Sequence, residues 1–155
     1  SEVRGPEFVT RKITLGIANI FAGKQDYIEL GNLEAKKDWG YAGDYVRAMW
    51  KMVRHDVPDD FVIGTGEMHT VREFVEKAFS LAVKKLKKNL QFRWVGNEGY
   101  LNDRMVVTVS KKYYRPLEAD NYMADYSKAK DVLGWEPFVR FADLVDIMVT
   151  ADLMR

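Results

Sequence analysis

Apolar residues recur every three or four positions in four stretches of the chain, which is the spacing of one face of a helix. These stretches cover residues 9–20, 45–53, 74–82 and 141–148. Thr70 and Glu73 precede the third stretch and match a capping box, in which each side chain satisfies a backbone N–H of the other residue. A shorter helix is expected after Asp125, ending near Gly134.

Short apolar runs between turn-forming residues predict strands. These runs are "YIEL" at 27–30, "DFVIG" at 60–64, "QFRWVG" at 91–96 and "MVVTVS" at 105–110. The continuous run "DFVIG" is typical of a buried strand, whereas the mostly polar residues 97–104 predict a loop. The fold class expected is therefore α/β: a small mixed α/β domain in which helices outweigh a few short strands.

Composition narrows the possible functions. A chain of 155 residues is long enough for one domain with a core of its own. Its 24 basic and 23 acidic residues nearly cancel, which argues against nucleic acid as a partner. The absence of cysteine excludes disulfides and thiolate chemistry and fits a reducing cytosol, so a cytoplasmic location is expected.

Other features exclude a membrane or a metal from the expected partners. No apolar run approaches the ~20 residues that cross a bilayer, and "SEVRGPEF" at residues 1–8 is not a signal peptide. His55 and His69 have no third metal ligand near them in the sequence, so no metal site is expected. Because the chain begins at Ser1 and not at Met, we expect a fragment or a processed chain.

The stretch "KKYYRPLEAD" at residues 111–120 is the first candidate for chemistry. Pro116 favours an extended backbone at Arg115, whose guanidinium matches phosphate oxygens. Glu118 could accept hydrogen bonds from two neighbouring ribose hydroxyls. The alternative is a surface ion pair worth about 0–1 kcal/mol, and the local sequence alone favours that alternative.

Two further stretches have a composition that suits phosphate. In "LGNLEAKKDWGYAGDY" at 30–45, Gly31 suggests close backbone approach, Lys36 and Lys37 carry positive charge, and Asp38 is expected to cap the following helix. In "EFVTRKI" at 7–13, Thr10, Arg11 and Lys12 lie near a helix N-terminus, which favours anions. A plain strand–turn–helix connection and an ordinary helix start are the alternatives.

A glycine-rich phosphate turn is missing. The sequence contains no G-x-G-x-x-G motif and no P-loop, so a dinucleotide fold is not indicated. If this chain handles a nucleotide, it does so with side chains and isolated backbone groups.

Five segments together resemble the GDP-mannose 4,6-dehydratase family within the extended short-chain dehydrogenases/reductases. They are "EFVTRKIT", "LGNLEAKKDWGYAGDYVRAMW", "DFVIGTGEMHTVREFVEKAF", "KYYRPLEAD" and "SKAKDVLGWEP", in the family's order and at similar spacing. The likeness runs from about Arg4 to Arg155 and covers only the C-terminal half of such an enzyme. The resemblance implies that the Rossmann half, with its NADP turn and catalytic residues, lies outside this chain.

The resemblance also implies a set of contacts to GDP-mannose. Val9 and Lys12 would face the GDP moiety, with Leu30 and Gly31 beside the nucleotide. Lys37 would meet the diphosphate, where the family usually has arginine; lysine keeps the charge but loses the paired donors. Val71 would be an apolar neighbour. Arg115 would bind the diphosphate and Glu118 the ribose.

Some residues depart from the family pattern or imitate its chemistry. "SEVRGPEF" replaces a stretch usually of the "SPRRG" type, and the polar stretch at 97–104 is shorter than is common. Tyr126 and Lys130 have the Tyr-x-x-x-Lys spacing of the catalytic pair, but they align with a late helix of the family and no nucleotide fold precedes them. No catalytic residue is therefore expected in this chain.

The function implied is substrate binding for a GDP-mannose 4,6-dehydratase, with residues 1–155 as its C-terminal nucleotide-sugar-binding domain. The family reaction is an NADP-dependent internal redox dehydration that yields GDP-4-keto-6-deoxymannose. The expected partners are GDP-mannose, an N-terminal dinucleotide-binding half and, in its absence, a second copy of the chain. The alternatives are a free-standing nucleotide-sugar-binding or assembly module without catalysis and, less favoured, an epimerase acting on another nucleotide sugar.

Overall fold

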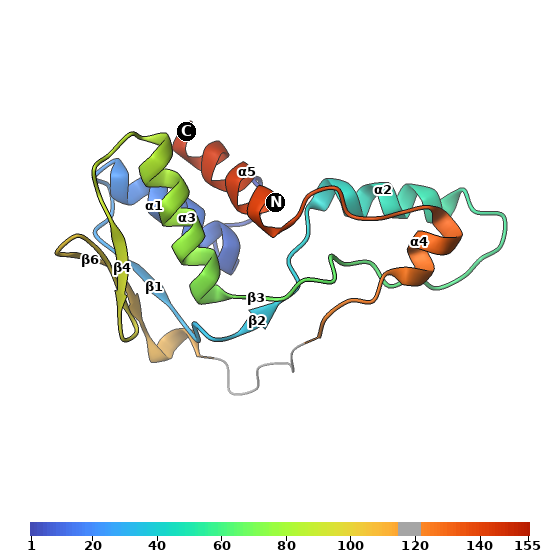
Figure 1. The fold of residues 1–155 in the computed structure, drawn as a ribbon, viewed down its shortest axis with the longest axis horizontal. Coiled ribbons are helices and arrows are strands. Elements are labelled where there is room, and N and C mark those ends of the chain that lie inside the picture. Colours follow the sequence, from blue (N-terminus) through green and yellow to red (C-terminus); the bar gives the residue numbers. More distant parts are fainter. Residues whose placement is uncertain (115–121) are drawn as a thin grey trace. The chain divides into compact units, whose positions relative to one another are not determined.

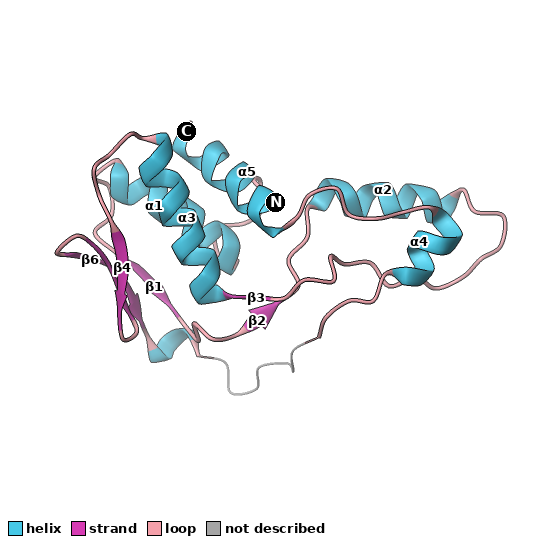
Figure 2. Ribbon diagram, viewed as in Figure 1, coloured by secondary structure: helices cyan, strands magenta, loops and turns pink. Residues whose placement is uncertain are grey.

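The computed structural model describes residues 1–114 and 122–155, so Arg115 and Glu118 lie outside the described residues. The described helices are α1 (Val9–Phe21), α2 (Ala42–Val53), α3 (Val71–Lys85), α4 (Ser127–Leu133) and α5 (Phe141–Leu153). The strands are β1 (Ile28–Leu30), β2 (Lys36–Lys37), β3 (His69–Thr70), β4 (Phe92–Val95), β5 (Glu98–Leu101) and β6 (Arg104–Val109), and a 3₁₀ turn, η1, covers Lys111–Tyr113. Figures 1 and 2 show that the helices outweigh the short strands, which confirms the expected mixed α/β class.

The described residues group into two compact units. The first unit holds residues 1–35, 70–114 and 145–155, and the second holds residues 36–69 and 122–144. All five predicted helices are confirmed, including the capping box of Thr70 and Glu73 at the start of α3. The short helix α4 ends at Gly134, whose φ of 58° is the left-handed geometry that favours glycine.

The first unit is built on a four-stranded sheet in the order β1-β6-β5-β4. β1 runs parallel to β6, and the other two pairs are antiparallel. Apolar residues of α1 and α3 are fully buried, among them Ile13, Ile17, Phe74 and Phe79. The rings of Phe79 in α3 and Phe92 in β4 stack with their centroids 4.6 Å apart, which joins the helical layer to the sheet.

The prediction of a polar loop over residues 97–104 is wrong. Glu98–Leu101 forms the strand β5, between two-residue turns at 96–97 and 102–103. Gly96 and Asn102 have φ angles of 58° and 52°, and positive φ angles of this kind close tight hairpins. The sequence conceals the strand because four residues are too few for an alternating pattern to stand out, although Gly99 and Leu101 are buried and pairing with β4 and β6 holds the strand in place.

The second unit has a small core around α2 and α4. Ala48, Ala129, Leu133 and Trp135 are its buried members. The indole Nε1 of Trp135 donates to the carbonyl of Asp44 at 2.9 Å. The Asp44 carboxylate in turn accepts from the backbone N–H groups of Phe138 and Val139, each at 2.9 Å. The chain after α4 is therefore tied to the first turn of α2.

Two features of this second unit differ from what the sequence suggests. The predicted strand "DFVIG" is wrong, because residues 60–64 pair with no strand among the described residues. The apolar stripe of α2 is exposed, although such a stripe ordinarily faces a core. Its exposed members are Val46, Met49, Trp50 and Val53. Among the described residues, no helix is long and apolar enough to cross a membrane.

Candidate nucleotide-binding site

The N-terminal end of α1 holds the first two candidate residues, Val9 and Lys12. Val9 begins the helix, and the preceding residue, Phe8, provides no side-chain cap for the first N–H groups. The Lys12 ammonium lies 3.3 Å from the centroid of the Tyr113 ring. Such a cation–π contact is worth about 0.5–2 kcal/mol, and it places the lysine against η1.

The end of β1 brings Leu30 and Gly31 to the same turn. Ser110 donates its backbone N–H to the carbonyl of Leu30 at 2.8 Å. A Cβ added to Gly31 would lie 2.3 Å from the Tyr113 carbonyl oxygen, so the two backbones are in direct contact. The structure thus gathers Lys12, Leu30 and Gly31 around 110–113, immediately before the stretch that contains Arg115.

Substitution of Gly31 by alanine tests this close approach. The added methyl group collides with a backbone carbonyl, which cannot rotate away as a side chain can. We expect Gly31→Ala to lower the free energy of unfolding by about 1–3 kcal/mol, measured by urea denaturation. Gly5→Ala is the control, because the atoms nearest to a Cβ there belong to the flexible carboxylate of Glu7. Equal effects of the two substitutions would contradict the prediction.

The N-terminus of α3 holds the third candidate region. Val71 is its first residue and is buried, and its N–H donates to the carbonyl of Ala35 at 3.1 Å. The next N–H, of Arg72, donates to the carbonyl of Leu33 at 2.9 Å. The segment after Gly31 is therefore fastened to the start of α3.

Arg72 is a residue that the sequence reasoning missed. Its guanidinium pairs with Glu34 at 2.6 Å and donates to the Gly96 carbonyl at 3.1 Å and to Oδ1 of Asn97 at 3.0 Å.

A hollow of about 710 Å³ opens beside the β4–β5 hairpin. It is lined by Asn97, Glu98, Thr108, Val109, Lys111 and Tyr114. Strand pairing assembles this lining from separate segments, so no local sequence motif identifies it.

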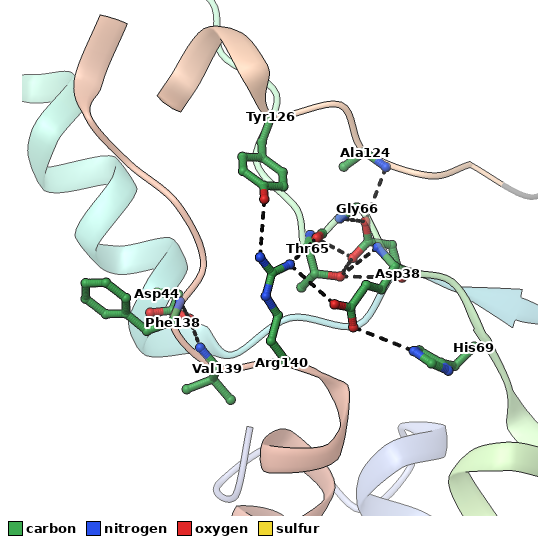
Figure 3. A network of polar contacts seen from close by, with 11 residues as sticks. Asp38, Asp44, Thr65, Gly66, His69, Ala124, Tyr126, Phe138, Val139 and Arg140 are labelled. Atoms are coloured by element: carbon green, nitrogen blue, oxygen red, sulfur yellow. Dashed lines mark hydrogen bonds and ion pairs between the residues drawn. The ribbon is translucent and has the colours of Figure 1, made fainter. Parts of the chain in front are cut away.

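In the second unit, Lys37 lies in β2 next to a carboxylate that joins three segments (Figure 3). Asp38 accepts hydrogen bonds from the N–H and hydroxyl of Thr65, at 2.9 and 2.5 Å, and from the N–H groups of Gly66 and Ala124. The prediction that Asp38 caps α2 is wrong, since Tyr41 is the N-cap residue. Asp38 instead holds Lys37 close to the loop at 65–66 and to the chain at 124.

Arg140 extends this network, as Figure 3 shows. It donates to the Thr65 carbonyl at 2.8 Å and to the Tyr126 hydroxyl at 3.3 Å, and it pairs with Glu67 at 3.4 Å. The hydrogen bond with Tyr126 raises the pKa of Arg140 above its ordinary value, although burial opposes the shift. Arg140 therefore remains charged and can hold the loop at 65–67.

The Tyr126 and Lys130 pair has structural partners. The Tyr126 ring lies edge-on to Trp135, with centroids 5.9 Å apart, and its hydroxyl meets Arg140. The Lys130 ammonium pairs with Glu136 at 3.2 Å. Each side chain is thus engaged in holding α4 and the chain after it. This geometry gives both side chains a packing role.

The structure distributes the eight candidate residues unequally. Lys12, Leu30 and Gly31 gather near Tyr113, and Val9 and Val71 belong to the same unit. Lys37 belongs to the second unit, and Arg115 and Glu118 lie outside the described residues.

The candidate residues do not fit a metal or a dinucleotide. In the described part of the chain, no three His, Cys, Asp or Glu side chains cluster as metal ligands. β1 leads into residues 31–35 without a glycine-rich turn, and β4–β6 form an antiparallel meander. The described residues therefore offer no dinucleotide turn of the kind that binds NADP.

Solved structures define the class of this fold. RMD from Pseudomonas aeruginosa, solved with NADPH, is similar over 98% of this chain and 44% of its own, with a TM-score of 0.73 and 15% identity. The dTDP-glucose 4,6-dehydratase of Bacillus anthracis, solved with NAD, matches over 96% of this chain and 39% of its own, with a TM-score of 0.65 and 19% identity. At these identities the likeness shows the fold alone, and the fold is that of part of such an enzyme.

Sequence relatives identify the family. The family description GDP-mannose 4,6 dehydratase matches residues 1–148. The GDP-mannose 4,6 dehydratases of Cricetulus griseus and Homo sapiens are each 49% identical over 160 residues, which cover 98% of this chain and 41% of theirs. The chain belongs to the GDP-mannose 4,6-dehydratase family, and it spans about 41% of the length of these relatives.

Proposed function

We propose that this chain is the GDP-mannose-binding part of a cytoplasmic GDP-mannose 4,6-dehydratase. The family membership and the partial coverage of the relatives support this assignment. The observation that carries it is the cluster of Lys12, Leu30 and Gly31 against 110–113, directly before the stretch with Arg115 and Glu118.

In the proposed complex, the diphosphate is the main source of affinity. The Arg115 guanidinium offers paired donors to its oxygens, while Lys12 and Lys37 supply single charges. Gly31 lets the nucleotide approach the backbone without a Cβ. Glu118 accepts from the ribose hydroxyls, and Val9, Leu30 and Val71 provide apolar contact.

The chemistry itself belongs to a dinucleotide-binding half outside this chain. That half supplies NADP and the catalytic residues, and the reaction is the internal redox dehydration of GDP-mannose to GDP-4-keto-6-deoxymannose. This chain's role is to hold the nucleotide so that the sugar reaches those groups. By itself the chain is therefore expected to be inactive.

Titration with GDP tests the binding role. We expect binding in the micromolar range by calorimetry, and a loss of about ten- to a hundredfold in affinity for Arg115→Ala, because charge-assisted hydrogen bonds contribute about 1.5–3 kcal/mol. Arg104→Ala is the matched control, since the Arg104 guanidinium pairs with Asp26 at 3.0 Å on the exposed side of β6. The proposal predicts unchanged affinity for this control.

Two results would count against the proposal. Absence of GDP binding by the unaltered chain would show that the pocket is not formed in this part. An equal loss in Arg115→Ala and Arg104→Ala would show that only general positive charge is being measured. If GDP binds but no keto product forms when a dinucleotide-binding half and NADP are added, the free-standing binding module replaces the dehydratase role.

A further inference from the structure

The ring of Tyr113 attracts two ammonium groups. Lys12 of α1 places its ammonium 3.3 Å from the ring centroid, and the ammonium of the neighbouring Lys112 lies 5.6 Å from it. Both distances fall within the range of about 6 Å over which an aromatic ring attracts a cation. Two positive side chains from segments far apart in the sequence therefore meet at one ring.

Neither lysine has a carboxylate partner in the part of the chain that the structure describes. Lys85, by contrast, pairs with Asp146 at 2.7 Å. An ammonium group has three N–H donors, and no oxygen of the described residues accepts a hydrogen bond from Lys12 or Lys112. Their donors are therefore available to an anionic ligand.

The two positive charges repel each other. Because they share one ring, the ammonium groups are at most roughly 9 Å apart, and physiological salt screens charges over about 8 Å. The negative face of the aromatic ring offsets part of this repulsion. An anion bound beside the ring would offset the rest, so the arrangement favours an anionic ligand.

The backbone that carries the ring is held in place. The N–H of Tyr113 donates to the Ser110 carbonyl at 3.1 Å, and the N–H of Ser110 donates to the Leu30 carbonyl at 2.8 Å. A Cβ on Gly31 would lie 2.3 Å from the Tyr113 carbonyl oxygen, so this backbone also packs against the end of β1. Ordering a lysine side chain on binding costs entropy, and a fixed ring that already holds Lys12 reduces that cost.

The ring and both lysines are within reach of a ligand. Tyr113 is 40% exposed, Lys12 is partly buried and Lys112 is exposed. Lysine binds phosphate as a point charge. A diphosphate carries its negative charge on two neighbouring groups, which suits two cations at one ring.

We propose that Tyr113 assembles Lys12 and Lys112 into one anion site, and that this site binds the diphosphate of the nucleotide sugar. Lys112 is then a further ligand of the diphosphate, and Tyr113 is a positioning residue that acts through Lys12. The choice of ligand rests on the proposed function, whereas the anion site itself is defined by the contacts of the ring.

Nuclear magnetic resonance of the full 155-residue chain tests the contact directly. The ring current of Tyr113 should shift the ε-methylene protons of Lys12 upfield. Tyr113→Phe keeps the ring and should keep this shift, whereas Tyr113→Leu should abolish it. Tyr100→Leu is the matched control, because the Tyr100 ring makes a similar contact, 5.3 Å from the Arg93 guanidinium carbon. Lys12 signals that Tyr113→Leu leaves unchanged would overturn the inference.

Titration with inorganic pyrophosphate tests the anion site without the nucleoside. We expect Lys12→Gln and Lys112→Gln each to weaken pyrophosphate binding at least about fivefold, because charge-assisted hydrogen bonds to phosphate oxygens are lost. Lys88→Gln is the matched control for charge, since Lys88 is exposed beyond the end of α3. Equal losses in Lys112→Gln and Lys88→Gln would overturn the inference, because they would show an effect of general positive charge.

A double-mutant cycle separates positioning from a general structural role. Tyr113→Leu should weaken pyrophosphate binding about two- to fivefold, which corresponds to a cation–π contact at an exposed site. In the Lys12→Gln background the same substitution should have less than about a twofold effect. Equal losses in both backgrounds would show that the ring only supports the fold, and the positioning role would fail.

Titration with GDP distinguishes the inference from the proposed function. If pyrophosphate binding depends on Lys112 and Tyr113 as expected but GDP binds no more tightly than pyrophosphate, the anion site stands and the proposed nucleotide role fails. If GDP binds and Lys112→Gln and Tyr113→Leu leave its affinity unchanged, the inference fails and the proposed function stands. Absence of binding of both probes by the unaltered chain would overturn both.

Discussion

Replacing Asp152 by alanine is expected to lower the free energy of unfolding by about 3–5 kcal/mol. The Asp152 side chain in α5 is fully buried, and Arg11 of α1 pairs with it at 2.9 Å through two guanidinium nitrogens. The hydroxyl of Thr14 donates to the same carboxylate at 2.7 Å. Loss of the carboxylate leaves a buried guanidinium without its countercharge.

Arg11 also joins the N-terminal segment to this cluster. Its Nη1 donates to the carbonyls of Glu2 and Arg4, at 2.8 and 3.0 Å. If the Arg11 guanidinium moves, the segment before α1 loses these hydrogen bonds. Lys12, the next residue in α1, is then expected to move as well. We expect Asp152→Ala to weaken GDP binding as well as stability.

Asp146→Ala is the matched control on the same helix. The Asp146 carboxylate is about half exposed and pairs with Lys85 at 2.7 Å. Surface pairs of this kind contribute about 0–1 kcal/mol, so the two variants should differ by several kcal/mol in urea denaturation followed by circular dichroism. Equal losses would show that the buried pair contributes no more than a surface pair.

Replacing Trp135 by alanine is expected to cost about 3–5 kcal/mol as well. Trp135 is the largest buried side chain in the core of the second unit. Its removal leaves a cavity, and the Asp44 carbonyl loses the indole donor at 2.9 Å. Because this core has four buried members among the residues that the structure describes, few neighbours are at hand to refill that space.

Trp50→Ala controls for the loss of an indole. Trp50 is 58% exposed on the outer face of α2, so its removal should change stability by less than about 0.5 kcal/mol. Thermal unfolding followed by circular dichroism measures both variants. A loss of stability for Trp50→Ala that matches that for Trp135→Ala would contradict the assignment of buried and exposed faces on α2.

Helices were predictable because their signals are local. The apolar spacing at 9–20 and 74–82 and the box of Thr70 and Glu73 act within a few residues, and α1 and α3 form where these signals lie. The strand at 98–101 was not predictable, because its four residues are too few to show an alternating pattern and take their conformation from pairing with β4 and β6. The prediction for residues 60–64 was wrong in the opposite direction. Their apolar run is typical of a strand, but no other strand among the described residues pairs with them.

For the candidate site too, the sequence indicated the residues but not the contacts that they make. Residue type and family resemblance were enough to select Lys12, Gly31, Arg115 and Glu118. They could not show that the Lys12 ammonium lies over the Tyr113 ring or that Gly31 touches the backbone there, since these contacts join segments some eighty to one hundred residues apart. Arg72 was missed because its partners, Glu34 after β1 and Asn97 in the β4–β5 turn, reach it only when these two segments meet the start of α3.

The sequence by itself determined the family, the helices and the residue types that suit a nucleotide, because each of these is encoded in short segments. Only the tertiary structure decided which apolar residues are buried. The stripe of α2 has the spacing of a core-facing helix, yet Ala48, Tyr45 and Met52 face the core and Trp50 faces outward. The physical reason is that burial depends on which surface a neighbouring segment covers, and helical periodicity alone does not specify that neighbour.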